Sequence, residues 1–104
     1  MTIRTLTAAT AALLALAATQ ALGSDIRVDN GREIIRAGDP ASKLARYLGS
    51  PVYAEYGRVC VKPSHSSCRK NNSGRGRIYQ YHYKDLYYTI EVYDGTITRI
   101  EWSR

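Results

Sequence analysis

The C-terminal end of this chain alternates between apolar and polar residues with a period of two, and two short turns divide the alternation into three parts. Residues 77–83, 86–93 and 96–102 each fit a β-strand, because successive side chains of a strand point to opposite faces. Lys84-Asp85 fits a two-residue turn. Asp94-Gly95 is a strong hairpin signal, since a type I′ turn needs a positive φ at both central residues. The sequence therefore predicts a three-stranded antiparallel meander.

Two-residue turns fix which residues lie opposite one another in this meander, and opposed residues share a face of the sheet. The resulting pairs are Tyr83–Leu86, Tyr81–Tyr88, Tyr79–Ile90 and Val92–Ile97. One face then carries the apolar side chains of Tyr79, Tyr81, Tyr83, Leu86, Tyr88, Ile90, Val92 and Ile97, and the other carries Gln80, His82, Lys84, Thr89 and Glu91. Ile100 and Trp102 fall out of phase with the apolar row. A β-bulge near Thr98 or Arg99 corrects the phase, and we expect one there.

A short helix is predicted upstream of the meander, over residues 40–48. Asp39 is suited to cap its amino end and Pro40 to occupy its first position. Gly49 fits the residue after the helix, which takes a positive φ, and Pro51 prevents the helix from resuming. One helix face carries Ala41, Leu44, Ala45 and Leu48 at helical spacing. We expect this face to pack on the apolar face of the meander.

The expected fold class is therefore α+β, with a short helix and an antiparallel meander in two layers. The meander has three strands, or four if residues 52–61 also form one. Residues 24–30 are polar and are predicted to fray, and residues 32–36 fit a short strand or a helical turn. Residues 57–76 are rich in turn-forming serine, asparagine and glycine, which predicts a long basic loop.

Residues 1–23 have the features of a secretory signal peptide. Arg4 supplies a positive charge, an uncharged run rich in alanine and leucine follows, and small residues stand at the cleavage spacing. Cleavage before Ser24 leaves residues 24–104 as a single small domain with no transmembrane segment. The alternative is an uncleaved membrane anchor, which the shortness and weak hydrophobicity of the run argue against. We expect a bacterial periplasmic or secreted protein.

The chain has two cysteines, Cys60 and Cys68, and a pair of cysteines in an exported protein predicts a disulfide. In the chain-entropy model so small a ring contributes roughly 2.5 kcal/mol to stability, so it shapes the loop more than it holds the fold. The alternative is a zinc site made by the two cysteines with His65 and His82, since thiolates and imidazoles suit zinc. Because the close Cys-x-x-Cys spacing is missing and export favours oxidation, we expect the disulfide and no metal.

The formal net charge of +6 is unevenly distributed, because no acidic residue lies between Glu55 and Asp85. The candidate binding residues of this basic block are Arg58, Lys62, Arg69, Lys70, Arg75 and Arg77. A block of one sign indicates an anionic partner, and the alternative is a solvated loop that keeps the protein soluble. Tyr87 and Tyr93 fall on the polar face of the meander and are the aromatic candidates for contact with a partner.

No set of residues suited to catalysis stands out. His65 is flanked by serines, but a serine nucleophile needs a base that a third group orients, and the basic block holds no acidic residue. The glycines around Arg75 do not stand between a strand and a helix, as they do in phosphate-binding loops. We therefore expect no enzymatic activity and no cofactor.

Two segments of the chain resemble a small bacterial periplasmic family, domain of unknown function 2845. They are residues 30–39, which read Asn-Gly-Arg-Glu-Ile-Ile-Arg-Ala-Gly-Asp, and residues 44–51, which end in Gly-Ser-Pro. The aromatic Tyr79-Gln80-Tyr81 and the terminal Asp94-Gly95-Thr96-Ile97 are similar to the last strands of the broader BamE (SmpA/OmlA) type of fold. The resemblance covers the chain from residue 30 onward apart from the basic loop, and it implies a periplasmic binding scaffold without catalytic residues.

The chain departs from this family at its cysteines. The family places its two cysteines where this chain has Asn30 and Leu48, and both are replaced together, as a paired disulfide would be. No cysteine stands at the cleavage site, so the lipid anchor of BamE is missing. This difference argues against a direct role in outer-membrane protein assembly.

Two functions fit these features. The first is a non-enzymatic periplasmic binding or envelope-accessory module, whose basic block contacts lipopolysaccharide, anionic phospholipid, a wall polymer or an acidic protein, with nucleic acid not expected. The second is a protein inhibitor of a secreted hydrolase, because BamE-like domains also occur in β-lactamase inhibitor proteins and a disulfide-closed loop could enter an active site. The two differ in salt dependence, since binding through surface charges weakens as salt rises.

Overall fold

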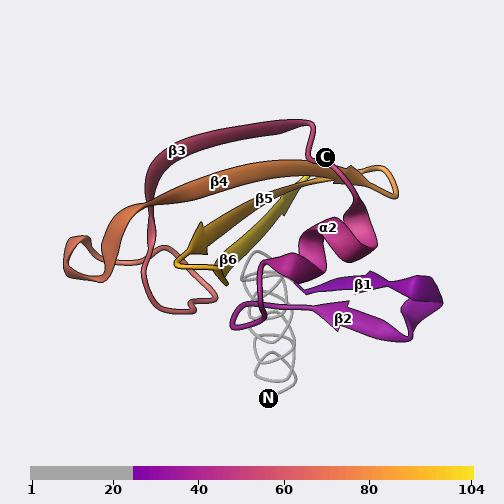
Figure 1. Cartoon of the computed structure of the whole chain (residues 1–104), viewed down its shortest axis with the longest axis horizontal. Helices are drawn as coiled ribbons and strands as arrows, with labels where there is room; N and C mark the ends of the chain where they lie inside the picture. Colours follow the sequence, from indigo (N-terminus) through magenta and orange to yellow (C-terminus); the bar gives the residue numbers. More distant parts are fainter. Residues whose placement is uncertain (1–24) are drawn as a thin grey trace, which may run out of the picture.

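The computed structural model describes residues 25–104 of the chain (Figure 1). The predicted signal peptide, residues 1–23, and its cleavage before Ser24 lie outside the described residues. Within residues 25–104, no helix has the length and apolar character needed to cross a membrane.

The molecule combines one α-helix with two antiparallel sheets, so the predicted α+β class is confirmed. The larger sheet has the order β3-β4-β5-β6, and the smaller sheet pairs β1 with β2. The strand bounds are Ile26–Val28 (β1), Glu33–Ile35 (β2), Tyr53–Cys60 (β3), Ser73–Tyr83 (β4), Leu86–Tyr93 (β5) and Thr96–Ser103 (β6), and the helix α2 spans Ser42–Leu48. Single turns of 3-10 helix, η1 (Asp29–Gly31) and η2 (Lys70–Asn72), complete the chain. The meander therefore has four strands, with β3 in the segment where the sequence left a fourth strand open.

The predicted register of the meander is confirmed across both turns. Tyr81 lies opposite Tyr88, and Val92 lies opposite Ile97. The register shifts after Glu91, which pairs with Arg99, so that Thr98 is the extra residue of a β-bulge. Beyond the bulge, Ile100 lies opposite Ile90 and Trp102 opposite Tyr88, so these apolar side chains share the core face.

Helix α2 begins after the predicted position, because the preceding chain pairs with β6. Gly38 N–H donates to the Ile97 carbonyl (2.7 Å), and Ile97 N–H donates to the Asp39 carbonyl (2.8 Å). The prediction that Asp39 caps the helix is wrong, since its carboxylate accepts from Arg36 N–H (3.0 Å) and Lys43 Nζ (3.1 Å). Gly49 ends the helix at φ +77°, as expected.

The core lies between the apolar face of the sheet on one side and α2 with the β1–β2 ribbon on the other (Figure 1). Leu44 is the buried residue of α2, with 2% of its surface exposed. The residues buried with it are Ile26, Val28, Ile35, Tyr81, Tyr88, Ile90, Val92, Ile97 and Ile100. Burial disfavours ionised tyrosine, and it raises the pKa of both Tyr81 and Tyr88. The predicted contact between the helix and the tyrosine-bearing face is therefore present.

The segment expected to fray is instead part of the core. Ile26 and Val28 of β1 are buried, and Ile26 lies opposite Ile35 of β2. The tight connection between the two strands uses positive φ values at Asp29, Asn30 and Gly31. This prediction failed because a three-residue strand offers too little alternation to be distinguished from a polar tail.

The predicted basic loop over residues 57–76 is mostly strand. Its first residues belong to β3 and its last to β4, so the connection is confined to residues 61–72. Glycine, which indicated a loop, instead permits close packing: a Cβ on Gly76 would collide with the Val92 carbonyl oxygen and a methyl group of Val59. Beyond Arg77, β4 pairs only with β3, and the two strands continue as a curved ribbon past the end of β5 (Figure 1).

Replacing Leu44 tests the packing of the helix on the sheet. Leu44→Ala should lower the free energy of unfolding by about 2–5 kcal/mol, because it leaves a cavity under α2. Urea unfolding followed by circular dichroism measures this loss. The control, Ser42→Ala, changes an exposed residue of the same helix, and a similar loss in both variants would contradict the packing.

The opposed glycines of the ribbon, Gly57 and Gly76, form a matched pair. Gly76→Ala should cost on the order of 1–3 kcal/mol, because a backbone carbonyl blocks the new methyl group. Gly57→Ala should cost less, since its methyl group would meet only the flexible end of Ile78, at 2.8 Å. Thermal unfolding of both variants shows which loses more stability. Equal losses would contradict the close packing of Gly76 on the Val92 carbonyl.

Candidate functional site

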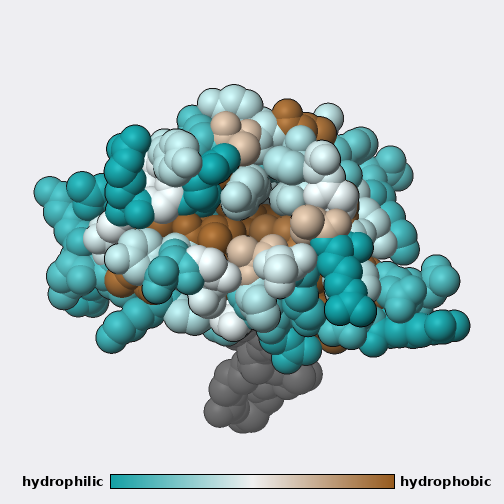
Figure 2. All heavy atoms as spheres, viewed as in Figure 1, coloured by the Kyte–Doolittle hydropathy of each residue, from teal (hydrophilic) through white to brown (hydrophobic). Residues whose placement is uncertain are grey.

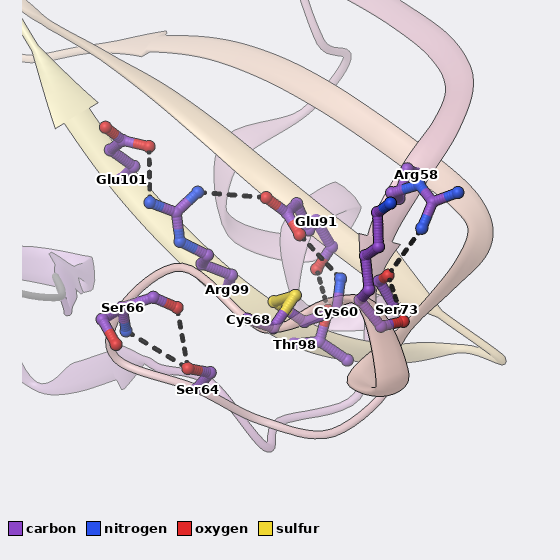
Figure 3. The surroundings of a disulfide bond; sticks show 11 residues. Arg58, Cys60, Ser64, Ser66, Cys68, Ser73, Glu91, Thr98, Arg99 and Glu101 are labelled. Carbon is purple, nitrogen blue, oxygen red and sulfur yellow. Dashed lines mark hydrogen bonds and ion pairs between the residues drawn. A yellow bond between two sulfur atoms is a disulfide. The ribbon is translucent and has the colours of Figure 1, made fainter.

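A disulfide between Cys60 and Cys68 closes the connection between β3 and β4, with Cα atoms 5.6 Å apart (Figure 3). This pairing is as predicted, and it removes both sulfur atoms from the zinc site considered as an alternative. The two histidines of that set lie apart, because His65 is exposed in the connection while His82 stacks on Tyr87 with ring centroids 4.5 Å apart. Glu91 lies near both sulfurs, but a disulfide does not offer the thiolates that zinc binds.

Glu91 fastens the ribbon to the rest of the sheet at this end. One carboxylate oxygen accepts the Cys60 N–H (2.8 Å), and the other accepts from Arg99 (3.1 Å), as Figure 3 shows. The side chains of Glu91 and Arg99 are only 14% and 20% exposed. Arg99 also contacts Glu101 at 2.9 Å. These charges satisfy one another, so this cluster has a structural role.

The β3–β4 ribbon carries a second group of polar side chains that we call the arginine–tyrosine face. Its members are Tyr56, Arg58, Arg75, Arg77 and Tyr79. Arg58 lies opposite Arg75 and Tyr56 opposite Arg77, so all four side chains share a face. Tyr79 follows Arg77 on that face and continues toward the buried Tyr81. The arginine–tyrosine face is thus the extension of the core face beyond the reach of α2.

Tyrosine rings lie against the guanidinium groups of Arg75 and Arg77 on this face. The Arg77 guanidinium carbon lies 4.3 Å from the ring centroid of Tyr56 and 5.2 Å from that of Tyr79. The Arg75 guanidinium carbon also lies near Tyr56, 5.8 Å from its ring centroid. Such cation–π contacts orient a guanidinium, and Arg77 Nη1 also donates to the Tyr56 hydroxyl (3.3 Å). Tyr56 is 63% exposed, so the cluster is open to a partner.

The electrostatics of the face favour an added anion. Arg58 and Arg75 are like charges directly opposite on neighbouring strands, which is unfavourable by itself. Within residues 25–104, ion pairs involve only Lys43 and Arg99 among the basic residues, so no carboxylate neutralises the face. The hydrogen bond from Arg58 to Ser73 Oγ (3.0 Å) leaves the guanidinium charged. Buried Arg77 Nε has no hydrogen-bond partner among these residues.

A hollow of about 250 Å³ lies between the two opposed arginines. Its lining residues are Gly57, Arg58, Ser73, Gly74 and Arg75. A volume of this size accepts a carboxylate or phosphate group with its immediate substituents. Ser73, the one hydroxyl in this lining, accepts from Arg58 and donates to the Lys70 carbonyl (2.9 Å).

Three of the six predicted basic residues come together on this face: Arg58, Arg75 and Arg77. Lys70 lines a neighbouring hollow with Arg58, beside the disulfide. Lys62 and Arg69 are exposed residues of the connection. Tyr56 was not predicted as a site residue. It stands two residues before Arg58, and in a strand this spacing places both side chains on the same face.

The predicted aromatic candidates lie on the opposite face of the sheet. Tyr87 is 40% exposed and is covered on one side by His82. Tyr93 is half-buried near Gly74. On the same polar face, Tyr53 donates to Glu55 (2.9 Å), and this hydrogen bond raises the pKa of Tyr53. None of these side chains belongs to the arginine–tyrosine face.

Two other hollows border the helix, and Lys43 lines the first of them with Glu33 and Asp39. Lys43 binds Glu33 (2.9 Å), Asp39 (3.1 Å) and the Ile34 carbonyl (3.0 Å), and the hydrogen bonds to Glu33 and Asp39 raise the pKa of Lys43. This satisfied cluster joins β2 to α2. A shallow groove of about 270 Å³ separates α2 from β4, with Tyr79 and Tyr81 in its wall. Figure 2 shows hydrophobic side chains at the bottom of a hollow that hydrophilic side chains surround.

Comparisons of the chain with protein-family models, curated proteins and solved structures found no match. The resemblance to domain of unknown function 2845 and to the BamE type of fold stays a prediction. The support for a function comes from the arrangement of this chain's own residues.

Proposed function

We propose that this protein is a non-enzymatic binding module of the bacterial envelope that holds an anionic partner on the arginine–tyrosine face. One observation carries the proposal: three arginines lie side by side on the β3–β4 ribbon, and no carboxylate among the described residues pairs with them. Paired guanidinium groups bind carboxylate and phosphate oxygens through charge-assisted hydrogen bonds.

The envelope location draws on three features. The predicted signal peptide directs the chain out of the cytoplasm. The Cys60–Cys68 disulfide is stable in an oxidising compartment such as the periplasm. The resemblance to a periplasmic family points to the same place.

The non-enzymatic character rests on the surroundings of the two histidines. Ser64 beside His65 donates its hydroxyl to the Ser66 carbonyl (2.7 Å), and the connection holds no acidic residue that could orient the imidazole. His82 stacks on Tyr87 at the far end of β4 from the arginines. Neither histidine has the partners of a general base.

Neutralising the opposed arginines tests this function. Arg58→Gln with Arg75→Gln should weaken binding to poly-glutamate about tenfold or more, because each charge-assisted hydrogen bond contributes about 1.5–3 kcal/mol. Arg77 stays unchanged, since it is half-buried between rings. Binding is measured by titration calorimetry at low ionic strength and again near 0.15 M salt, where the screening length is only about 8 Å.

The matched control, Arg27→Gln with Arg32→Gln, removes the same charge from exposed positions around β1 and η1. It should keep most of the affinity. Equal losses in the two double variants would show that net charge alone attracts the probe, and no loss in either would remove the proposal. A secreted hydrolase that binds tightly at high salt, and independently of Arg58 and Arg75, would favour the inhibitor alternative.

A further inference from the structure

Strand β3 forms one edge of the large sheet, and the hydrogen-bonding phase shows which of its backbone groups face outward. Val61 N–H donates to the carbonyl of Asn72 (3.0 Å) in the register of the β3–β4 ladder. Because antiparallel pairs alternate, odd-numbered residues of β3 bond to β4 and even-numbered residues point their N–H and C=O groups away. The outward residues are Ala54, Tyr56, Arg58 and Cys60.

In the part of the chain that the structure describes, only one end of this edge is closed. The outward N–H of Cys60 is taken by the Glu91 carboxylate. For Ala54, Tyr56 and Arg58, no backbone hydrogen bond to another segment is found within residues 25–104. The edge from Tyr53 to Arg58 is therefore open where the arginine–tyrosine face begins.

This edge lacks most of the features that usually block strand pairing. Exposed edges are commonly protected by proline, by charged side chains, above all lysine, or by short length. The two charged residues of β3, Glu55 and Arg58, point to opposite faces of the ribbon. β3 is eight residues long and contains neither proline nor lysine. Tyr53 and Tyr56, on its two faces, are 54% and 63% exposed. The open edge of β3 thus offers backbone hydrogen-bonding groups next to aromatic rings and arginine side chains.

We propose that the partner of the arginine–tyrosine face is an extended acidic segment of a polypeptide, which adds to β3 as a fifth, antiparallel strand. This inference rests on the proposed function and narrows its partner to one class. Repeated N–H and C=O groups recognise a polypeptide backbone, whereas a lipid headgroup or a polysaccharide cannot match their alternation. An antiparallel partner continues the pattern of all ladders in this sheet.

The geometry also predicts where the acidic residues stand in that segment. Residues opposite Ala54, Tyr56 and Arg58 share their face and direct their own N–H groups toward β3. Acidic side chains at these positions reach Arg58 and Arg75. The recognised segment therefore has acidic residues at alternate positions, and the same residues supply the hydrogen bonds to the edge.

Backbone methylation of a defined peptide tests strand addition. The probe is a peptide as long as β3 with alternating glutamate and threonine. N-methylation of the glutamate amides should weaken binding about tenfold or more, because it removes hydrogen bonds to β3. N-methylation of the threonine amides leaves the peptide charge and length equal and should leave the affinity nearly unchanged. Equal effects of the two methylations would overturn strand addition.

A matched pair of protein variants tests the same edge. Ala54→Pro removes an outward N–H, which the β4 ladder does not use, and should weaken peptide binding about tenfold. Ala54→Val keeps the N–H and should lose much less affinity than the proline variant does. Circular dichroism checks folding, and if the proline variant does not fold, the methylated peptides decide.

Together these variants and probes distinguish strand addition from the anion-binding function on which it rests. If Arg58→Gln with Arg75→Gln abolishes peptide binding while Ala54→Pro and both methylations do not, side chains alone hold the partner and strand addition is wrong, but the anion-binding function stands. If vesicles of phosphatidylglycerol bind in an arginine-dependent manner and the peptide does not, the partner is a lipid, which also overturns this inference. If neither probe depends on the arginines, the proposed function itself fails.

Discussion

The contact between Glu91 and the Cys60 backbone is the interaction on which the position of the arginine–tyrosine face depends. Pairing between β4 and β5 ends at Arg77, and this contact ties the β3–β4 ribbon to β5 beyond that point. The carboxylate joins Cys60 N–H to the Arg99 guanidinium, and the disulfide ties the same residue to the connection that follows. A half-buried carboxylate is favourable here because both of its oxygens are hydrogen-bonded. The arrangement anchors the end of a ribbon that contains three glycines.

One face of the large sheet changes from buried core to exposed arginines along its length. Under α2 it carries buried tyrosine and isoleucine, and beyond α2 it carries arginines supported by tyrosine rings. The row passes from Tyr81 through Tyr79 to Arg77 on a single strand, so the core positions the arginine–tyrosine face directly. Tyrosine suits this transition, because its ring packs in the core while its hydroxyl stays in contact with water or a polar neighbour.

Much of this fold could be predicted because its strands are joined by two-residue turns. Asp94-Gly95 predicted the register of β5 and β6. The out-of-phase Ile100 predicted a bulge near Thr98 or Arg99, and the structure has it at Thr98. The pairing of the cysteines followed from compartment and count. Residues 57–76 were misassigned because glycine and serine favour loops locally, whereas here a tertiary contact requires the missing side chain of Gly76. The arginines of the site were identified by charge, but their alignment with Tyr56 needed the strand register that this error concealed.

Amide hydrogen exchange measured by NMR tests most directly whether the ribbon is closed at Cys60 and open along the rest of its edge. Of the four outward amides of β3, Cys60 should exchange slowly, since Glu91 accepts its proton, while those of Tyr56 and Arg58 should exchange rapidly. The inward amides of Gly57 and Val59, in the ladder with β4, should be protected. Protection of Tyr56 and Arg58 equal to that of Gly57 would contradict the account, because it would mean that the edge is already occupied.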